Sequence, residues 1–322
     1  MTKSRRNTAI ERVLIVGSSR GLGLDLARAY ARRGAVVAIC ARDPDEVARA
    51  ASELADTGAR VLAEVCDATS ADQVARMVAN VEAQLGAIDL LITCAATIQV
   101  GPLECMTHAD FEEAMRQIFW SAYHPTMAVL PGMRARRGGH IAHVTSFGGK
   151  LAVPHMLPYS SAKFAATGFS SGLRAEVAKD GIKVTTIAPG LLRTGAHVNA
   201  PFKGQRAKEY SWFSAGAVAP LLSLPSEKAA ARIVRAIDRG VAEVTLSAGV
   251  RAAIILQAAL PNAMAKLMAL QNRFLPSAGG GSTEAQPGQE VARGSRSRWV
   301  RAIDRYGRAN AERHHAYPGP QV

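Results

Sequence analysis

The chain has 322 residues, of which 48% are hydrophobic and 5% aromatic, enough apolar content for one large α/β core. Its formal net charge of +13 is scattered along the chain, without the single basic face interleaved with aromatics that favours a nucleic-acid partner. No stretch is long enough for a signal-peptide core or a membrane span, and the four cysteines have neither disulfide nor metal-ligand spacing, so we expect a cytoplasmic protein without a metal site.

Apolar runs alternate with amphipathic segments after a basic extension, residues 1–11. The runs predict strands at Val13–Val16, Val36–Cys40, Arg60–Val65, Ile88–Ile92, His140–Val144, Lys183–Ile187 and Glu243–Leu246. Helices are predicted at Leu22–Arg33, Pro44–Ala55, Ala71–Leu85, Phe111–Arg136, Tyr159–Lys179 and Lys228–Arg239. Strands this apolar must be covered on both faces. The expected fold is therefore a Rossmann-type, doubly wound parallel sheet of about seven strands with helices on both faces.

One α/β domain is expected over residues 12–275. It includes a stretch without a clear strand, Leu191–Leu224, and an apolar helical region over residues 250–275. The Gly-, Pro- and polar-rich run that begins residues 276–322 predicts a flexible linker, followed by a short helical tail at Ser297–Asn310. Pro125 and Pro131 are expected to interrupt or end parts of the longest helix.

A glycine cluster, Gly17-Ser18-Ser19-Arg20-Gly21-Leu22-Gly23, lies between the first strand and the first helix. Glycines let backbone N–H groups approach a pyrophosphate, whose negative charge the N-terminus of the helix favours. The simpler alternative is a tight turn without a ligand. The order strand, loop, helix favours a dinucleotide site.

A second set of residues carries acid–base chemistry. Ser146 follows the strand His140–Val144, Tyr159 comes thirteen residues later, and Lys163 lies four residues beyond Tyr159 on a predicted helix. Positions i and i+4 share a helix face, so the ammonium group is expected to lower the pKa of the phenol. The alternative is a surface tyrosine beside a solvated lysine.

The Gly-x-x-x-Gly-x-Gly spacing, the serine and the Tyr-x-x-x-Lys pair together resemble the short-chain dehydrogenase/reductase family over residues 12–246. The resemblance implies that Tyr159 transfers the proton, Lys163 tunes it and holds the nicotinamide ribose, and Ser146 orients the carbonyl. It also implies that Asp67 meets the adenine, although a helix N-cap is the simpler role. The implied cofactor-binding residues are Gly17, Ser19, Arg20, Gly21, Leu22, Gly23, Arg42, Asp67, Ala68, Ala95, Tyr159, Lys163, Pro189, Gly190 and Thr194.

The second strand ends without the carboxylate that NAD-dependent enzymes commonly use to bind the ribose. Ala41 stands in that place, Arg42 follows it, and Arg20 lies in the glycine loop. Two guanidinium groups suit a 2′-phosphate in charge and in geometry. The sequence therefore predicts NADPH as the cofactor.

Two positions depart from the family pattern. Thr93-Cys94-Ala95-Ala96 replaces the usual Asn-Asn-Ala-Gly, and Ile118 stands where the family has an asparagine that supports a water relay from the lysine. Because isoleucine offers no side-chain hydrogen bond, an inactive or weak NADP(H)-binding regulatory protein is the alternative to an enzyme.

The expected partner is a small carbonyl or alcohol substrate. The resemblance also implies that residues 191–224 form a lid over the substrate. Its aromatic residues, Phe202, Tyr210, Trp212 and Phe213, suggest a bulky or apolar substrate if they line the site, and are ordinary core otherwise. The resemblance implies a homo-oligomer. Residues 250–275 either pack on the core or another subunit, or lie at a membrane interface through Arg251, Lys266 and Arg273. A membrane- or nucleic-acid-bound adaptor is a third hypothesis, which rests on the basic charge and the C-terminal tail.

Overall fold

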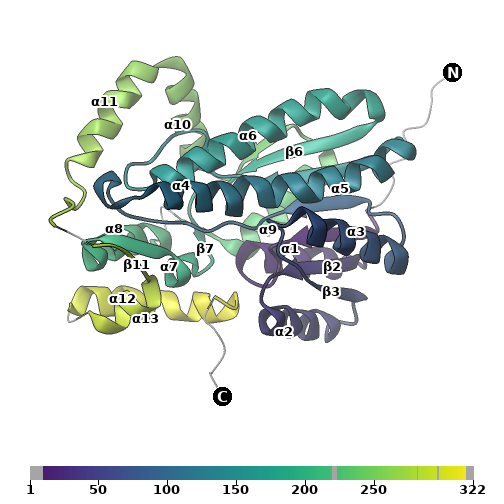
Figure 1. Ribbon diagram of the computed structural model, residues 1–322, viewed down its shortest axis with the longest axis horizontal. Coiled ribbons are helices and arrows are strands. Elements are labelled where there is room, and N and C mark those ends of the chain that lie inside the picture. The colour runs from purple at the N-terminus through teal and green to yellow at the C-terminus, as the bar shows by residue number, and fades with distance from the viewer. Residues whose placement is uncertain (1–9, 220–222, 281, 296, 317–322) are drawn as a thin grey trace.

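The computed structural model describes residues 10–219, 223–280, 282–295 and 297–316, so nearly all of the predicted basic extension, residues 1–11, lies outside it. Its centre is a seven-stranded sheet of order β10-β6-β5-β4-β1-β2-β3, in which every pairing is parallel (Figure 1). The strands are β1 (Arg12–Val16), β2 (Val36–Ala41), β3 (Val61–Val65), β4 (Leu90–Thr93), β5 (Gly139–Val144), β6 (Ile182–Ala188) and β10 (Glu243–Thr245). The predicted doubly wound sheet is confirmed.

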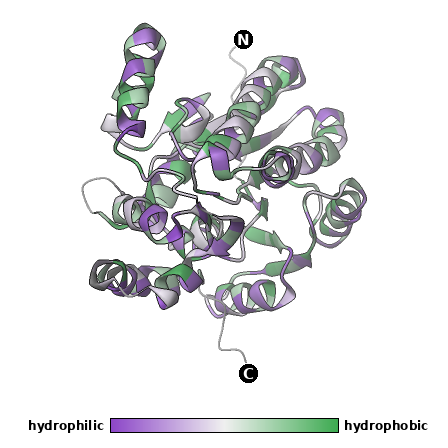
Figure 2. Cartoon of the chain, turned by 60° about the vertical axis from the view of Figure 1, so that its left-hand side comes forward, coloured by the Kyte–Doolittle hydropathy of each residue, from purple (hydrophilic) through white to green (hydrophobic). Residues whose placement is uncertain are grey.

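Two apolar layers sandwich this sheet, because successive side chains of a strand point to opposite faces. In β1, Val13 and Ile15 join the core cluster on one face, and Leu14 and Val16 join that on the other. The first face is covered by α1 (Gly21–Ala31), α2 (Pro44–Ala55) and α9 (Ser226–Arg239), and the second by α3 (Ala71–Leu85), α5 (Ser121–Ala135) and α6 (Leu157–Val177). In Figure 2 the central strands are mainly hydrophobic, whereas the outer helices mix hydrophobic and hydrophilic residues.

The longest predicted helix is divided by a short segment of π-helix. It begins as α4 (His108–Met115), passes through a five-residue π-helical segment, Arg116–Trp120, and continues as α5. Pro125 and Pro131 lie inside α5 and do not end it, so the expected proline break is wrong. Pro125 comes within the first turns after the wide π segment, where the regular backbone hydrogen-bond ladder is already disturbed.

The region predicted to lack strands, residues 191–224, contains three short ones. It comprises β7 (Leu192–Arg193), α7 (Ala196–Asn199), β8 (Pro201–Gly204), α8 (Arg206–Val218) and β9 (Leu224–Pro225). β7 pairs with β9, and β8 pairs with a strand of the C-terminal region. Because these strands form by pairing between distant segments, they carry no local alternation of hydrophobic residues that sequence analysis could detect.

The C-terminal region is more regular than the linker and short tail that its composition predicted. β11 (Ser282–Pro287) pairs antiparallel with β8, and α12 (Gly288–Gly294) and α13 (Arg298–Arg313) follow. Val291 and Val300 are buried in a third core cluster together with Tyr210 of α8. The Gly- and Pro-rich composition is therefore overridden by tertiary packing against the lid.

Between these regions, α10 (Ala248–Ala259) and α11 (Pro261–Asn272) project as an arm from the body (Figure 1). Among the described residues, no single helix is long and apolar enough to cross a membrane. The pair α10 and α11 meets that criterion jointly, although the two helices are bent by 119°. Short 3-10 turns complete the fold at Leu103–Cys105, Phe147–Gly149 and Ala178–Asp180.

Candidate active site

A cleft of about 1290 Å³ opens at the carboxyl ends of the central strands, where the strand order reverses between β1 and β4. This is the place where open parallel sheets bind ligands. Every residue that the sequence predicted for the site lines this cleft: Gly17, Ser19, Arg20, Gly21, Leu22, Gly23, Arg42, Asp67, Ala68, Ala95, Ser146, Tyr159, Lys163, Pro189, Gly190 and Thr194. The fold thus gathers residues that lie up to 177 positions apart between Gly17 and Thr194.

The glycine loop is fixed by close backbone approaches. Gly17 has φ +82°, and a Cβ atom there would lie 2.5 Å from the backbone nitrogen of Ala95. A Cβ atom at Gly23 would lie 2.0 Å from the carbonyl oxygen of Gly17. Larger residues at either position would push the loop away from β4 or from the start of α1. Gly21, Leu22 and Gly23 at the N-terminus of α1 line the cleft, and the N-terminus of a helix favours an anion.

A carboxylate that the sequence analysis did not single out, Glu46, lies beside the two residues at the tip of this loop. It accepts hydrogen bonds from Ser19 Oγ at 2.7 Å and from Arg20 Nη1 at 2.9 Å. Arg42 is exposed at the same end of the cleft. Arg20 is therefore partly neutralised, and Arg42 is the less restrained of the two cations.

Asp67 lies at the same end, held by the backbone rather than by a helix cap. Its Oδ1 accepts a hydrogen bond from Thr69 N at 2.9 Å, whereas Ser70 caps α3. Burial opposes the charged form, but the bonds from Thr69 outweigh burial and lower the pKa of this carboxyl. Asp67 therefore presents a charged acceptor at this end of the cleft.

Ser146, Tyr159 and Lys163 meet at the opposite end of the cleft. A Cβ atom built on Gly148 would lie 3.1 Å from Tyr159 Cε1 and 3.5 Å from Ser146 Oγ, so both side chains border this glycine. Lys163 Nζ donates a hydrogen bond to the carbonyl of Val144 at 3.1 Å and lies 5.7 Å from the centre of the Tyr159 ring. The predicted side-by-side placement of phenol and ammonium is present.

The electrostatics of this pair differ from the expectation, which had the ammonium lower the pKa of the phenol. Burial raises the pKa of Tyr159 to about 12, and the Ser146 hydroxyl only partly offsets this effect. Burial also lowers the pKa of Lys163 to about 8. Cys94, which lies close by, has its thiol pKa raised to about 11 by burial. Desolvation therefore dominates the pKa values of all three groups at this end of the cleft.

Ile118 lies in the π-helical segment and packs with Tyr159 in an apolar cluster. Its neighbours Gln117 and Ser121 line the cleft instead. Gln117 Nε2 donates to Glu113 at 2.9 Å, and Ser121 Oγ donates to the Gln117 carbonyl at 2.7 Å. Polar groups thus stand beside Ile118, and they were missed because the family comparison drew attention to one position only.

The exits of β5 and β6 are joined by backbone hydrogen bonds. Phe147 N donates to the carbonyl of Pro189 at 2.8 Å, which holds the serine turn against Pro189-Gly190. A Cβ atom on Gly21 would lie 3.7 Å from Thr194 Cβ. Thr194, which follows β6, therefore lies against the glycine loop, and both line the cleft.

The family model for short chain dehydrogenases matches residues 11–202. The chain belongs to this family. Oxidoreductase BOA17 of Botryotinia fuckeliana is 36% identical over 180 residues, which cover 56% of this chain and 65% of that protein. The dehydrogenase/reductase SDR family protein 7-like of Anopheles gambiae is 34% identical over 242 residues, 73% of this chain and 74% of its own. The family resemblance in the sequence motifs is thus confirmed.

A solved relative shares the fold. The crystal structure of a gluconate 5-dehydrogenase from Burkholderia cenocepacia in complex with NADP and tartrate superposes with a TM-score of 0.65. It is 28% identical in sequence, and the match covers 75% of this chain and 95% of that one. A nicotinamide cofactor therefore accompanies this fold in a relative.

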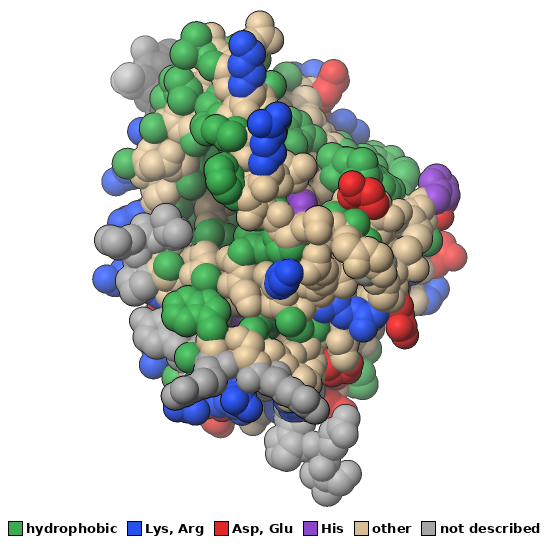
Figure 3. Space-filling view, turned by 90° about the vertical axis from the view of Figure 1, so that its left-hand side faces the viewer, with side chains coloured by type: hydrophobic (Ala, Val, Ile, Leu, Met, Phe, Trp, Pro, Cys, Tyr) green, Lys and Arg blue, Asp and Glu red, His purple; other side chains and the backbone are tan. Residues whose placement is uncertain are grey.

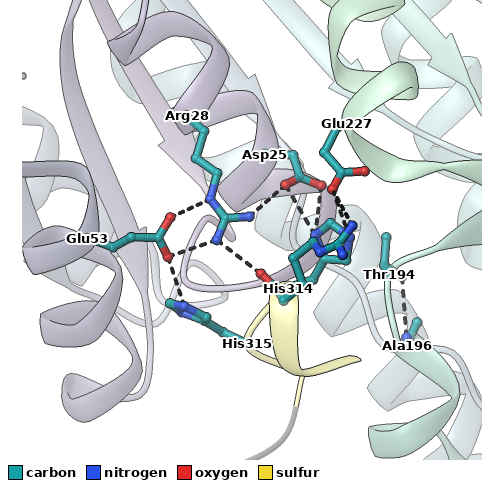
Figure 4. A network of polar contacts seen from close by, with 9 residues as sticks. Asp25, Arg28, Glu53, Thr194, Ala196, Glu227, His314 and His315 are labelled. Carbon is teal, nitrogen blue, oxygen red and sulfur yellow. Dashed lines mark hydrogen bonds and ion pairs between the residues drawn. The ribbon is translucent and has the colours of Figure 1, made fainter. Parts of the chain in front are cut away.

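In this short-chain dehydrogenase, the segment around His314 lies against Asp25 and Arg28 of α1, a contact that the sequence did not predict (Figure 4). Gly21 N donates a hydrogen bond to the His314 carbonyl oxygen at 2.8 Å. The His314 imidazole is 1% exposed, and its Nδ1 lies 3.1 Å from the Asp25 carboxylate. Burial favours the neutral acid, but His314 and other polar neighbours outweigh it and lower the pKa of Asp25. We call residues 311–316 the C-terminal clasp.

Arg28 anchors this clasp from α1 (Figure 4). Its guanidinium binds both oxygens of Glu53, at 2.5 and 2.8 Å, and donates to the Arg313 carbonyl at 3.1 Å. His315 Nε2 lies 2.9 Å from Glu53. The hydrogen bond from Arg28 is the main reason that the pKa of Glu53 is lowered. Ala316 at the end of the clasp lines the cleft.

The aromatic residues of the lid divide between core and cleft. Phe202 and Tyr210 are fully buried in the third core cluster, whereas Trp212 and Phe213 line the cleft. Half of the expected aromatic lining is therefore present. Met264, Leu267 and Met268 of α11 extend the apolar lining beyond what the sequence analysis assigned to the site.

Proposed function

We propose that this chain is an NADPH-dependent oxidoreductase that interconverts a carbonyl and an alcohol, with Tyr159 as the general acid and base. One observation carries the proposal: Ser146 and Tyr159 flank Gly148 beside Lys163, in the same cleft whose other end is the glycine loop. Family membership supports the oxidoreductase class.

The residues present fit a nicotinamide dinucleotide. The cleft exceeds the roughly 300–1,000 Å³ of a drug-sized ligand pocket, which leaves room for a dinucleotide and a substrate. The glycine-loop residues on either side of Gly21, whose own N–H is bonded to the His314 carbonyl, would hold the pyrophosphate. Arg42 with Arg20 would hold the 2′-phosphate. Relatives solved with NADP or NADPH support this choice of cofactor. When bound, the reduced cofactor supplies the hydride that attacks the carbonyl carbon.

The protein's own residues complete the reaction. Tyr159 donates its phenolic proton to the carbonyl oxygen as the hydride arrives, and the Ser146 hydroxyl orients that oxygen by a hydrogen bond. The product is the alcohol, and the phenolate is reprotonated afterwards. Tyr159 and Lys163 are 7% and 3% exposed, so both act where little water competes for the transferred proton.

The lining at the substrate end favours an apolar compound. Trp212, Phe213, Met264 and Leu267 line the cleft, and Trp212 and Phe213 belong to the same apolar cluster as Tyr159. Hydrophobic walls with a few polar groups at the reacting centre are typical of sites for small organic substrates. We therefore propose a bulky or apolar ketone or aldehyde as the substrate class.

A second function is favoured by one observation. Ile118 occupies the family's asparagine position and is buried in the same apolar cluster as Tyr159, so reprotonation must follow another path or be absent. A weak or inactive NADP(H)-binding regulatory protein would retain cofactor affinity without turnover.

The experiment follows NADPH absorbance with a panel of apolar ketones and aldehydes, for the wild type and for Tyr159→Phe. We expect turnover by the wild type and a loss of about 10²–10⁴-fold in the variant, the usual contribution of a general acid, with unchanged NADPH affinity. Tight NADPH binding without turnover of any compound would favour the regulatory alternative. Failure to bind NADPH would contradict both.

A further inference from the structure

The arm formed by α10 and α11, with the following residues to Phe274, exposes an unusual amount of apolar surface. Among the described residues of the two helices only Met264 is buried. Five large side chains that do not line the cleft are exposed: Ile255, Leu256, Leu260, Leu270 and Phe274. Leu260 is 52% and Phe274 81% exposed. Figure 3 shows hydrophobic and basic side chains side by side at the upper end of this face.

The charge of this arm has one sign only. Residues 246–283 contain no aspartate or glutamate, and their three charged residues are Arg251, Lys266 and Arg273. All three are exposed. Apolar side chains mixed with basic ones are the pattern that binds at the interface of an anionic bilayer, where the apolar groups enter the acyl boundary and the cations meet headgroups.

A second copy of the chain fits this surface less well. A symmetric dimer brings the same patch of each copy together, so the three cations would face the same three cations without a carboxylate between them. A spanning segment fits less well too. Each helix has 12 residues, roughly 18 Å at 1.5 Å per residue, against a hydrocarbon thickness of about 30 Å.

The inner side of the same arm borders the cleft. Ala253 of α10 and Met264, Leu267 and Met268 of α11 line it. At the base of the arm, a Cβ atom built on Gly190 would lie 2.7 Å from Val250 Cγ2. One side of the arm therefore lines the cleft that holds Tyr159, and its other side exposes apolar residues to solvent.

We propose that α10, α11 and Phe274 form a surface that binds a bilayer with anionic headgroups, and that an apolar carbonyl substrate enters the cleft from that bilayer past α11. The second half of this inference rests on the proposed function, whereas bilayer binding does not. The helices lie in the interface plane, with Leu256, Leu260 and Phe274 inserted and Arg251, Lys266 and Arg273 at the headgroups.

The first test measures co-sedimentation of the full chain with vesicles of phosphatidylcholine, with or without about one third phosphatidylserine, in about 0.1 M salt. We expect binding to the anionic vesicles that is at least about tenfold tighter than to the neutral ones. The triple variant Leu256→Ser, Leu260→Ser, Phe274→Ser should lose binding to both. The charge reversal Arg251→Glu, Lys266→Glu, Arg273→Glu should lose the preference for anionic lipid.

A matched control separates the arm from total charge. Arg32→Glu, Arg76→Glu, Arg235→Glu changes the net charge by the same amount at exposed positions of α3, α9 and the end of α1. This control should bind vesicles like the wild type. Equal loss of binding in the control, or no binding by the wild type, would overturn the proposal. So would a wild-type dimer in sedimentation velocity that the serine variant dissociates.

Two further readouts keep the outcomes distinct. Unchanged circular dichroism and NADPH affinity would show that the serine variant is folded. With an apolar ketone in anionic vesicles, we expect the serine variant to raise KM about tenfold, with kcat retained. Vesicle binding without turnover would contradict the proposed function alone, and turnover that is indifferent to vesicles would contradict delivery from the bilayer.

Discussion

Gly21, in the glycine loop, donates its backbone N–H to the carbonyl oxygen of His314, 293 positions later in the chain, at 2.8 Å. The same histidine buries its ring against Asp25 of α1. The C-terminal clasp is therefore part of the wall of the cleft beside the glycine loop, and its side chains stabilise α1 as well as α13.

His314→Ala should lower the free energy of unfolding by about 2 kcal/mol. The change leaves the buried Asp25 carboxylate with Arg28 as a remaining partner, which reduces the 3–5 kcal/mol typical of breaking a buried pair. Urea denaturation at pH 7 measures this loss. His108→Ala is the control, since that side chain is 87% exposed. Equal stability of the two variants would show that the pair with Asp25 contributes nothing.

Asp110→Asn should make the free energy of unfolding depend less on pH below about pH 4. Burial favours the neutral acid, but Lys203, 2.6 Å away, and Gln99 lower the pKa of Asp110 to about 2. A lowered pKa stabilises the fold above the ordinary value of 3.8, and this gain is lost as pH falls toward 2. The loss corresponds to about 2 kcal/mol.

Urea midpoints between pH 5 and about 2 for the wild type and Asp110→Asn check this expectation. Asp72→Asn, at an exposed position of α3, serves as the control. A wild-type slope retained in Asp110→Asn would assign the acid sensitivity to other carboxylates, such as Asp25.

Alcohol oxidation should rise with pH, whereas carbonyl reduction should not. Because burial raises the pKa of Tyr159 to about 12, the phenol is protonated at neutral pH, ready to act as an acid. Oxidation needs the phenolate, so its kcat/KM should increase about tenfold per pH unit from about pH 7 to 9. Initial rates in both directions measure this, after a preincubation control for stability. A plateau of oxidation below pH 8 would mean that Lys163 and the bound cofactor lower the pKa of the phenol.

The preference for NADPH should depend on Arg42 more than on Arg20. Arg42→Ala should weaken NADPH binding about tenfold and leave NADH binding unchanged, since one charge-assisted hydrogen bond contributes about 1.5–3 kcal/mol. Glu46→Gln should strengthen NADPH binding, because it removes a negative charge 2.9 Å from Arg20. Titration calorimetry with both cofactors provides the measurement, and Arg49→Ala on α2 is the control. Equal effects on NADH and NADPH would contradict a 2′-phosphate role.

The sequence by itself determined the sheet, the two helical layers and the residues gathered in the cleft. These features depend on short-range patterns. The apolar run of β1, the glycine spacing Gly17–Gly23 and the i, i+4 pair Tyr159–Lys163 are each encoded within a few residues. The order of the strands then brings their carboxyl ends together without further information.

Only the tertiary structure decided the rest, because long-range pairing and burial have no local signature. The strand β11 exists through its pairing with β8, and His314 reaches Gly21 through the packing of α13 on α8. The pKa of Tyr159 is raised mainly by desolvation, which depends on how deeply the fold buries the phenol. The exposed apolar side of α10 and α11 likewise cannot be predicted locally, because the fold decides which apolar residues are left out of the core.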